Sequence, residues 1–140
     1  MNKINKLKSI FKNYKIDGYI VPKNDEFFGE YTPEYKDNLK FISNFSGSFG
    51  FALILKRNNY LFVDGRYTLQ AKIQSSQQYK ILTLPKKYPS DILKNKKFSI
   101  GFDPKLHTEM MLNRFFKKTE CNLVPINENL INKLFVRKNI

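Results

Sequence analysis

The residues of this chain that could carry chemistry are few and far apart. His107 is the only histidine and Cys121 the only cysteine. A metal site needs several ligands at a defined spacing, and a nucleophilic cysteine needs a basic partner, but neither residue has one close in sequence. The acids Asp25 and Glu26 are adjacent, so their side chains rarely converge on one point, and a solvated loop is the better interpretation. These residues predict no metal site and no nucleophile.

A cluster of serine and glycine at residues 46–50 could cradle a phosphate or form a tight turn. Its sequence, Ser-Gly-Ser-Phe-Gly, has neither the Gly-Lys-Ser/Thr ending of a P-loop nor the Gly-x-Ser-x-Gly pattern of a nucleophile elbow. It leads into an apolar, strand-like run, so no helix N-terminus would face a bound phosphate. A turn that feeds a strand is therefore favoured, and the residues alone indicate a non-catalytic domain.

The elements that must position these residues alternate between strand-like and helix-like patterns. Short apolar runs bounded by turn residues predict six strands, at residues 19–21, 51–55, 60–63, 81–84, 98–102 and 123–124. Amphipathic or breaker-free stretches predict helices at residues 2–15, 66–78, 88–94, 104–118 and 129–135, with a helical turn near 35–41. The spacing of Leu69 and Ile73 supports the second helix. The helix at 104–118 is expected to bury some of its apolar residues Leu106, Met110, Leu112, Phe115 and Phe116.

Asn58 and Asn59 separate the second and third predicted strands, and asparagine tolerates the positive φ of a hairpin turn. The remaining connections cross over through helices, which favours parallel pairing. We therefore expect an α/β fold. It should be a single domain with a mixed, mostly parallel sheet of about five or six strands, one hairpin and flanking helices.

Length and composition limit the class of protein. The 140 residues are 41% hydrophobic and 15% aromatic, which suffices for one core and makes disorder improbable. A lone cysteine excludes an internal disulfide framework and suits a reducing, cytoplasmic compartment. The longest apolar run covers residues 51–55, far short of the roughly 20 that a membrane span needs. Lysines interrupt the apolar residues at 1–16, so no secretory leader is predicted.

The formal net charge of +13 raises the possibility of nucleic-acid binding. Twenty-one of the basic residues are lysine and only four are arginine, and the excess is spread over the last two-thirds of the chain. A surface that reads grooves or phosphates concentrates its charge and uses the bidentate fork of arginine. We therefore expect a solvated lysine-rich surface and no specific nucleic-acid partner.

Four blocks of sequence resemble a known family. They are residues 17–22 (Asp-Gly-Tyr-Ile-Val-Pro), the acidic loop with Asp25, Glu26, Glu30 and Tyr31, residues 41–50, and residues 64–71 (Asp-Gly-Arg-Tyr-Thr-Leu-Gln-Ala). Their order and spacing are similar to the N-terminal domain of Xaa-Pro aminopeptidases (aminopeptidase P), within the creatinase and prolidase superfamily. Residues 100–104 and 129–135 resemble later parts of that domain, so the resemblance covers nearly the whole chain.

The chain departs from the family pattern at several positions. Phe27 stands where the acidic loop usually has a histidine, Asn44 replaces a glycine, and Phe49 replaces a small residue in the turn. Asn132 and Phe135 stand where the closing segment usually has aspartate and tryptophan. These differences concern fine contacts of the loop with substrate and leave the expected fold unchanged.

The resemblance implies a creatinase/prolidase-type N-terminal domain over residues 1–140, with a ribonuclease H-like motif. It implies a parent metallopeptidase whose separate C-terminal pita-bread domain holds two divalent metals, usually Mn²⁺, and removes a residue that precedes proline. This chain would carry no catalytic, metal or cofactor residue. It would pack on that catalytic domain, support a homodimer and narrow the access of peptide substrates.

The resemblance also implies which residues serve an interface or the structure: Glu30, Tyr31, Phe45, Gly47, Ser48, Gly50, Asp64, Gly65, Arg66 and Tyr67. From the residues themselves, Asp64 and Arg66 flank Gly65 at a strand-to-helix turn, where they could cap the helix and form charge-assisted hydrogen bonds. The alternative function is a free-standing basic α/β module that binds acidic partners or nucleic acid.

Overall fold

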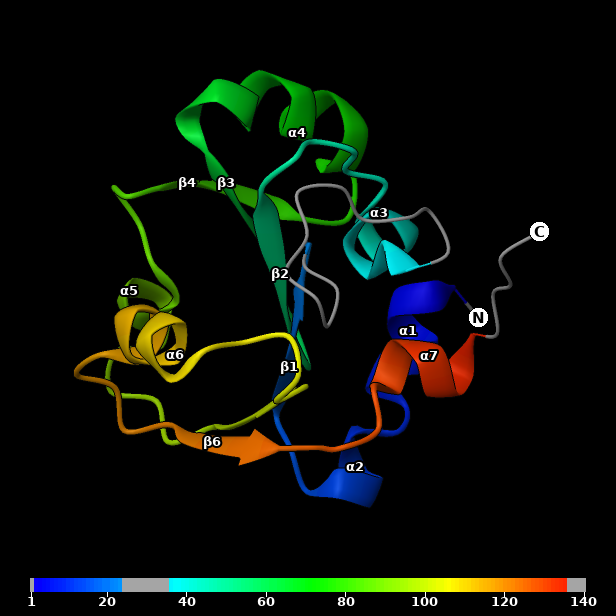
Figure 1. Ribbon diagram of the computed structural model, residues 1–140, viewed down its shortest axis with the longest axis vertical. Coiled ribbons are helices and arrows are strands. Elements are labelled where there is room, and N and C mark those ends of the chain that lie inside the picture. The colour runs from blue at the N-terminus through cyan, green and yellow to red at the C-terminus, as the bar shows by residue number, and fades with distance from the viewer. Residues whose placement is uncertain (1, 24–35, 136–140) are drawn as a thin grey trace.

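The computed structural model describes residues 2–23 and 36–135. A six-stranded sheet with the order β4-β3-β2-β1-β5-β6 forms the centre of the molecule (Figure 1). Only β2 runs against the other strands, so the sheet is mixed and mostly parallel, as the sequence predicts. The strands are β1 (Gly18–Pro22), β2 (Gly50–Leu55), β3 (Asn59–Asp64), β4 (Lys80–Leu84), β5 (Ser99–Phe102) and β6 (Asn122–Pro125).

The predicted hairpin joins β2 to β3. It closes through residues 56–58, where the Leu55 amide donates a hydrogen bond of 2.9 Å to the Asn58 carbonyl. All residues of β1 and β2 are buried, because these strands lie in the middle of the sheet with helices on both faces. This double burial explains why their sequences are continuous apolar runs instead of alternating patterns.

Helices cover both faces of the sheet, and the sheet divides the core into two clusters. Successive strand residues point to opposite faces, so Tyr19 and Val21 pack into one cluster and Ile20 into the other. Residues of α1, α2, α3, α4 and α7 complete the first cluster, whereas α6 and Leu93 after α5 complete the second (Figure 1). These helices are α1 (Lys3–Lys8), α2 (Phe11–Tyr14), α3 (Asn38–Ser43), α4 (Thr68–Ser75), α5 (Pro89–Ile92), α6 (Glu109–Phe116) and α7 (Leu130–Leu134).

The helix expected at residues 2–15 is wrong as a single element, because it is divided into α1 and α2. The Ser9 hydroxyl donates to the Lys6 carbonyl at 2.6 Å, and the Ile10 amide bonds to the Leu7 carbonyl three residues back. A side-chain hydrogen bond of this kind competes with the backbone ladder. The break still leaves Leu7 and Phe11 buried, so the apolar spacing gave no sign of it.

The helix expected at residues 104–118 begins later, at Glu109. Thr108 caps it by accepting a hydrogen bond of 3.1 Å from the Met111 amide. The residues before the cap form a turn that buries Leu106 and His107. Met110 is exposed, so the expected packing holds for Leu112, Phe115 and Phe116 on the helix but not for Met110.

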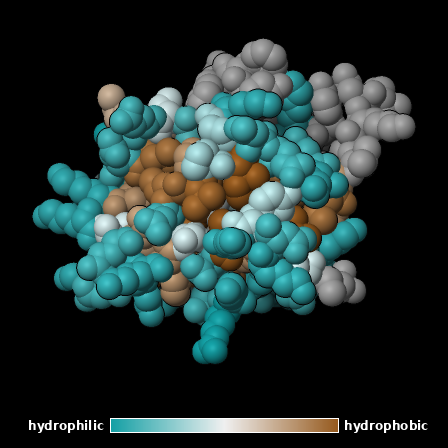
Figure 2. All heavy atoms as spheres, turned by 90° about the horizontal axis from the view of Figure 1, so that it is seen from below, coloured by the Kyte–Doolittle hydropathy of each residue, from teal (hydrophilic) through white to brown (hydrophobic). Residues whose placement is uncertain are grey.

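The sheet ends on one side at the edge strand β6. The face that includes β6 carries hydrophobic side chains near its centre and hydrophilic ones around them (Figure 2). Leu123 and Val124 of β6 are half-buried, since an edge strand has a neighbour on one side only. Across the part of the chain that the structure describes, no helix has the length and apolar character to cross a bilayer.

Candidate functional site

Two connections that are distant in sequence meet at one end of the sheet. Gly50, which begins β2, pairs with Val63 of β3, so the turn at residues 45–50 lies beside the segment that leaves β3. That segment is Asp64 followed by a short 3-10 helix, η2 (Gly65–Tyr67), and then α4. We call residues 45–50, 64–67 and the adjoining face of α4 the junction.

The junction brings together eight of the ten site residues expected from the sequence, namely Phe45, Gly47, Ser48, Gly50, Asp64, Gly65, Arg66 and Tyr67. Glu30 and Tyr31 lie outside the residues that the structure describes, as do Asp25, Glu26 and Phe27.

Hydrogen bonds attach the turn at 45–50 to α4. The Ser46 hydroxyl accepts from the side-chain amides of Gln70 and Gln74 at 3.0 and 2.9 Å. The Ser46 backbone amide donates to the side-chain Oε1 of Gln74 at 3.0 Å. The hydroxyls of Ser48 and Tyr67 are 2.5 Å apart. The side chains of both serines therefore form hydrogen bonds within the protein and hold the turn in place. This agrees with the interpretation of residues 46–50 as a turn that feeds a strand.

Phe45 fills the space beneath the turn. Its side chain is fully buried, and its ring lies edge-on to that of Tyr67 with centroids 6.1 Å apart. A Cβ atom added at Gly47 would lie 2.3 Å from the Phe45 ring, and one added at Gly50 would lie 3.0 Å from the Phe62 carbonyl oxygen. The close approach of the Phe45 ring thus requires glycine at position 47, and the Phe62 carbonyl leaves little room for a side chain at position 50. Neither glycine has a positive φ.

Asp64 caps η2, as the sequence predicts. Its carboxylate accepts hydrogen bonds from the Arg66 amide at 2.8 Å and from Arg66 Nε at 3.1 Å. These hydrogen bonds to the ionised form, the one from the amide first, lower the pKa of Asp64 below its usual value. Both side chains are exposed to solvent, so they offer no desolvated acid or base for catalysis.

Arg66→Ala should cause a small decrease in the melting temperature, and Asp64→Ala a larger one. The first change removes only an exposed ion pair, which contributes little, whereas the second also removes a helix cap. Thermal denaturation followed by circular dichroism measures both, with Arg57→Ala, at an exposed arginine in the hairpin turn, as the control. Equal melting temperatures for all three variants would contradict the capping interpretation.

An exposed apolar face adjoins these contacts. Leu69 and Ile73 on α4 are 72% and 76% exposed, and Phe49 in the turn is 43% exposed. α4 buries Ala71 and Ser75 on its opposite side, where Ser75 donates to the Ser43 carbonyl at 2.7 Å. The four-residue spacing of Leu69 and Ile73 indicated the helix, but an amphipathic pattern alone suggests that such residues face the core. Only the structure shows that this stripe faces outward.

The described residues contain no group of three or more histidine, cysteine, aspartate or glutamate side chains placed to hold a metal ion. His107 is buried against Phe102, with ring centroids 6.0 Å apart. Neither of its ring nitrogens has a hydrogen-bond partner within residues 2–23 and 36–135, and burial lowers its pKa to about 4. The histidine is thus a neutral part of the core under physiological conditions.

The family model for the Creatinase/Prolidase N-terminal domain matches residues 3–134. The chain belongs to this family. This agrees with the fold, because the X-prolyl aminopeptidase of Caenorhabditis elegans superposes on 99% of the chain with a TM-score of 0.83 and 27% identity. That enzyme is described as cytosolic with a di-nuclear active site, and the match covers 26% of it.

One further sequence relative supports the family, and one further solved structure supports the fold. Aminopeptidase P1 of Lotus japonicus is 32% identical over 143 aligned positions, which cover 96% of this chain and 22% of that protein. The N-terminal domain of the cytoplasmic peptidase PepQ from Mycobacterium tuberculosis has the same fold, with a TM-score of 0.71 over 94% of this chain and 97% of that domain. The chain thus spans about a fifth of the full-length aminopeptidases that it matches, and it corresponds to their N-terminal domain.

Proposed function

We propose that this chain is the non-catalytic N-terminal domain of a metal-dependent Xaa-Pro aminopeptidase. The observation that carries the proposal is the similarity to aminopeptidase P proteins over nearly the whole chain but only about 22% of their length. In the proposed parent protein, hydrolysis of the bond before proline belongs to a separate catalytic domain with two divalent metals, Mn²⁺ being our expectation. Such a metal pair supplies a hydroxide nucleophile at neutral pH and polarises the scissile carbonyl. We place the parent in the cytoplasm.

The exposed face of the junction is the surface that we assign to packing on the catalytic domain. Leu69, Ile73 and Phe49 expose apolar area beside a turn that hydrogen bonds hold in place. Covering these side chains removes apolar surface from water at about 25 cal/mol per Å². A domain fixed in this way would narrow the entrance to the active site, select short unfolded peptides and support the homodimer.

A fusion of this chain to the remainder of the C. elegans X-prolyl aminopeptidase tests the assignment. We expect release of the residue before proline by the fusion, and a strong decrease when Leu69 and Ile73 are both changed to aspartate. Met110→Asp is the matched control, because Met110 is 75% exposed but lies on α6, on the other side of the sheet. Equal activity of the fusion with and without the two α4 substitutions would contradict the assigned surface, and an inactive fusion would contradict the proposed function.

The purified chain by itself should release no N-terminal residue from an Arg-Pro-Pro peptide and should bind no Mn²⁺ tightly. The described residues supply no ligand group for a metal pair. Mass spectrometry of the peptide, with and without Mn²⁺, measures the first property, and calorimetric titration measures the second. Metal-dependent release of arginine by the chain would overturn the proposal.

Nucleic acid should bind the chain only weakly and without sequence preference. A +13 domain attracts any polyanion at low salt, but counterions replace contacts made by dispersed lysines as salt is added. Labelled single-stranded and duplex oligonucleotides, titrated at about 50 and 200 mM salt, should lose most of their affinity at the higher concentration. Submicromolar affinity there, or discrimination among sequences, would favour the alternative of a free-standing nucleic-acid module.

A further inference from the structure

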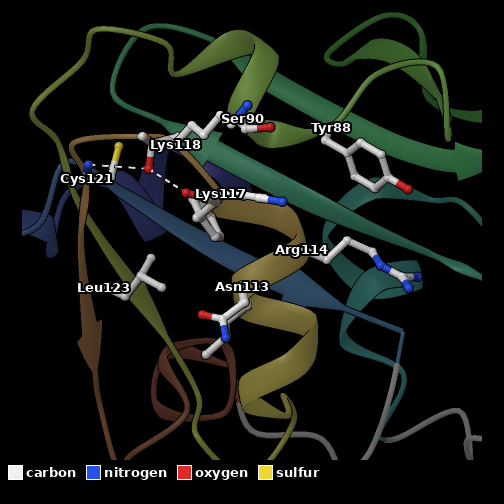
Figure 3. A pocket seen from close by; sticks show the side chains of 11 residues that line it. Tyr88, Ser90, Asn113, Arg114, Lys117, Lys118, Cys121 and Leu123 are labelled. Atoms are coloured by element: carbon white, nitrogen blue, oxygen red, sulfur yellow. Dashed lines mark hydrogen bonds between the residues drawn. The ribbon is translucent and has the colours of Figure 1, made fainter.

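A groove on the α5 and α6 side of the sheet has no part in the proposed function. Its volume is about 820 Å³, and it lies between α6, β6 and the start of α5. Leu112 and Phe116 of α6 are buried, and Leu123 of β6 is half-buried, so these side chains give the groove an apolar floor. Tyr88 and Ser90 line the side opposite α6, as Figure 3 shows.

Three cationic side chains surround this floor. Arg114, Lys117 and Lys118 all line the groove and are exposed. In Figure 3 the Arg114 side chain extends outward from α6, below Tyr88 in this view. Among the described residues, none of the three cations forms an ion pair. No carboxylate among the described residues therefore neutralises their charges.

Among the lining residues that the structure describes, none is acidic. The nearest acids in sequence are Asp91, whose carboxylate already accepts the Tyr88 amide at 2.8 Å, and Glu120, which is not among the lining residues. The groove thus has the positive potential and the apolar centre that a ligand with the opposite charge and an apolar group would complement.

The backbone that carries the cations is held in a defined turn. Lys117 is the C-cap residue that follows α6, and Lys118 has a left-handed conformation with φ of 66°. The Thr119 hydroxyl donates to the Phe116 carbonyl at 2.9 Å, and the Cys121 amide donates to the Thr119 hydroxyl at 3.4 Å. Cations at a helix C-terminus also interact favourably with the helix dipole. That interaction needs no apolar groove beside it. If these cations served only the helix dipole, an apolar group on a ligand would not affect binding, whereas it would if they served a binding site.

We propose that this groove binds an acidic segment of polypeptide that carries an apolar side chain among its carboxylates. The carboxylates would pair with Arg114, Lys117 and Lys118, and the apolar side chain would contact the floor formed by Leu112 and Phe116. Exposed ion pairs contribute little individually, so the apolar contact is needed for appreciable affinity. A single nucleic-acid strand fits less well, because it needs exposed aromatic rings for stacking. Among the described lining residues, Phe116 is buried and Tyr88 is half-buried. This proposal does not depend on the parent being an aminopeptidase.

Fluorescence polarisation of labelled peptides on the 140-residue chain tests the proposal. The probe is a short peptide in which two glutamates alternate with one leucine, and the comparison peptide has serine in place of leucine. At about 50 mM salt we expect the leucine peptide to bind about tenfold more tightly, and the double variant Arg114→Glu/Lys117→Glu to weaken it by about tenfold or more. Lys12→Glu/Lys72→Glu is the control of equal charge, at two exposed lysines on α2 and α4.

Cys121 gives a second measurement, because it is the only thiol of the chain and lines the groove. The leucine peptide should slow its alkylation by iodoacetamide, and the double groove variant should abolish that protection. The proposal would be overturned if both double variants weakened binding equally, or if the two peptides bound with the same affinity. It would also be overturned if the peptide left the alkylation rate unchanged, or if an oligothymidylate bound more tightly than the peptide. Melting temperatures of the variants confirm that each is folded.

Discussion

Phe45→Ala should lower the free energy of unfolding by about 3–5 kcal/mol, the range observed when a buried phenylalanine is truncated. The Phe45 side chain is fully buried beneath the turn at 45–50 and contacts the Tyr67 ring at its edge. Truncation would leave a cavity at the point where the turn, β2 and the start of α4 meet. Urea denaturation followed by circular dichroism measures the change.

Phe49→Ala is the matched control, because it removes the same side chain from the same turn at a position that is 43% exposed. We expect it to cost much less than Phe45→Ala. A second comparison isolates the contact with Gly47, whose added Cβ would meet the Phe45 ring. Gly47→Ala should be destabilising in the wild-type chain and nearly neutral in the Phe45→Ala background. Equal costs for the two phenylalanines would show that the turn does not depend on this packing.

The stability of the domain should decrease as the pH falls from about 6.5 to about 4, because of His107. Burial lowers the pKa of His107 to about 4 in the folded chain, although the charge of Asp103 opposes this, and the unfolded value is 6.5. Between these pH values the unfolded state binds more protons, so acid favours unfolding. One pKa unit corresponds to about 1.4 kcal/mol, and the histidine is already half protonated in the unfolded state at the upper pH and in the folded state at the lower pH. The expected loss over this range is therefore about 2–3 kcal/mol.

Urea titrations at several pH values measure this loss, and His107→Phe provides the control. The chain has no other histidine, so nothing else has an ordinary pKa near 6.5. Phenylalanine should preserve the edge-on contact with Phe102 and remove the titration. We expect the variant to keep a nearly constant stability between pH 6.5 and pH 5, below which carboxylates begin to contribute. The same pH dependence in wild type and variant would show that the histidine is not the cause.

The strands were predictable because their physical requirement is local. A strand buried on both faces must be apolar throughout and must end at turn residues, and β1 and β2 meet both conditions over consecutive residues. The asparagines at the hairpin, the crossovers through helices and the number of strands then limit the sheet to a mixed arrangement. The order of the strands in the sheet was not predictable in this way. β1 pairs with β5, which lies far away in the sequence, and no local pattern encodes that contact.

Helix boundaries were less predictable, because they depend on single hydrogen bonds that compete with the backbone ladder. The Ser9 hydroxyl divides one amphipathic stretch into α1 and α2, and the Thr108 cap delays the start of α6. The same apolar spacing is compatible with either boundary. The outward direction of Leu69 and Ile73 was equally unpredictable, because their spacing indicates a helix whichever side is buried, and α4 buries the small residues Ala71 and Ser75 instead.

The sequence by itself determined the fold class, the capping of η2 by Asp64 and the resemblance to the Creatinase/Prolidase N-terminal domain, since each rests on residue types over short spans. Only the tertiary structure decided that Ser46 is bound to α4, that Gly47 is required by Phe45, and that Arg114 and Lys117 share a groove with Leu123. Those relations join segments far apart in the chain, and their distances are set by how the sheet and helices pack.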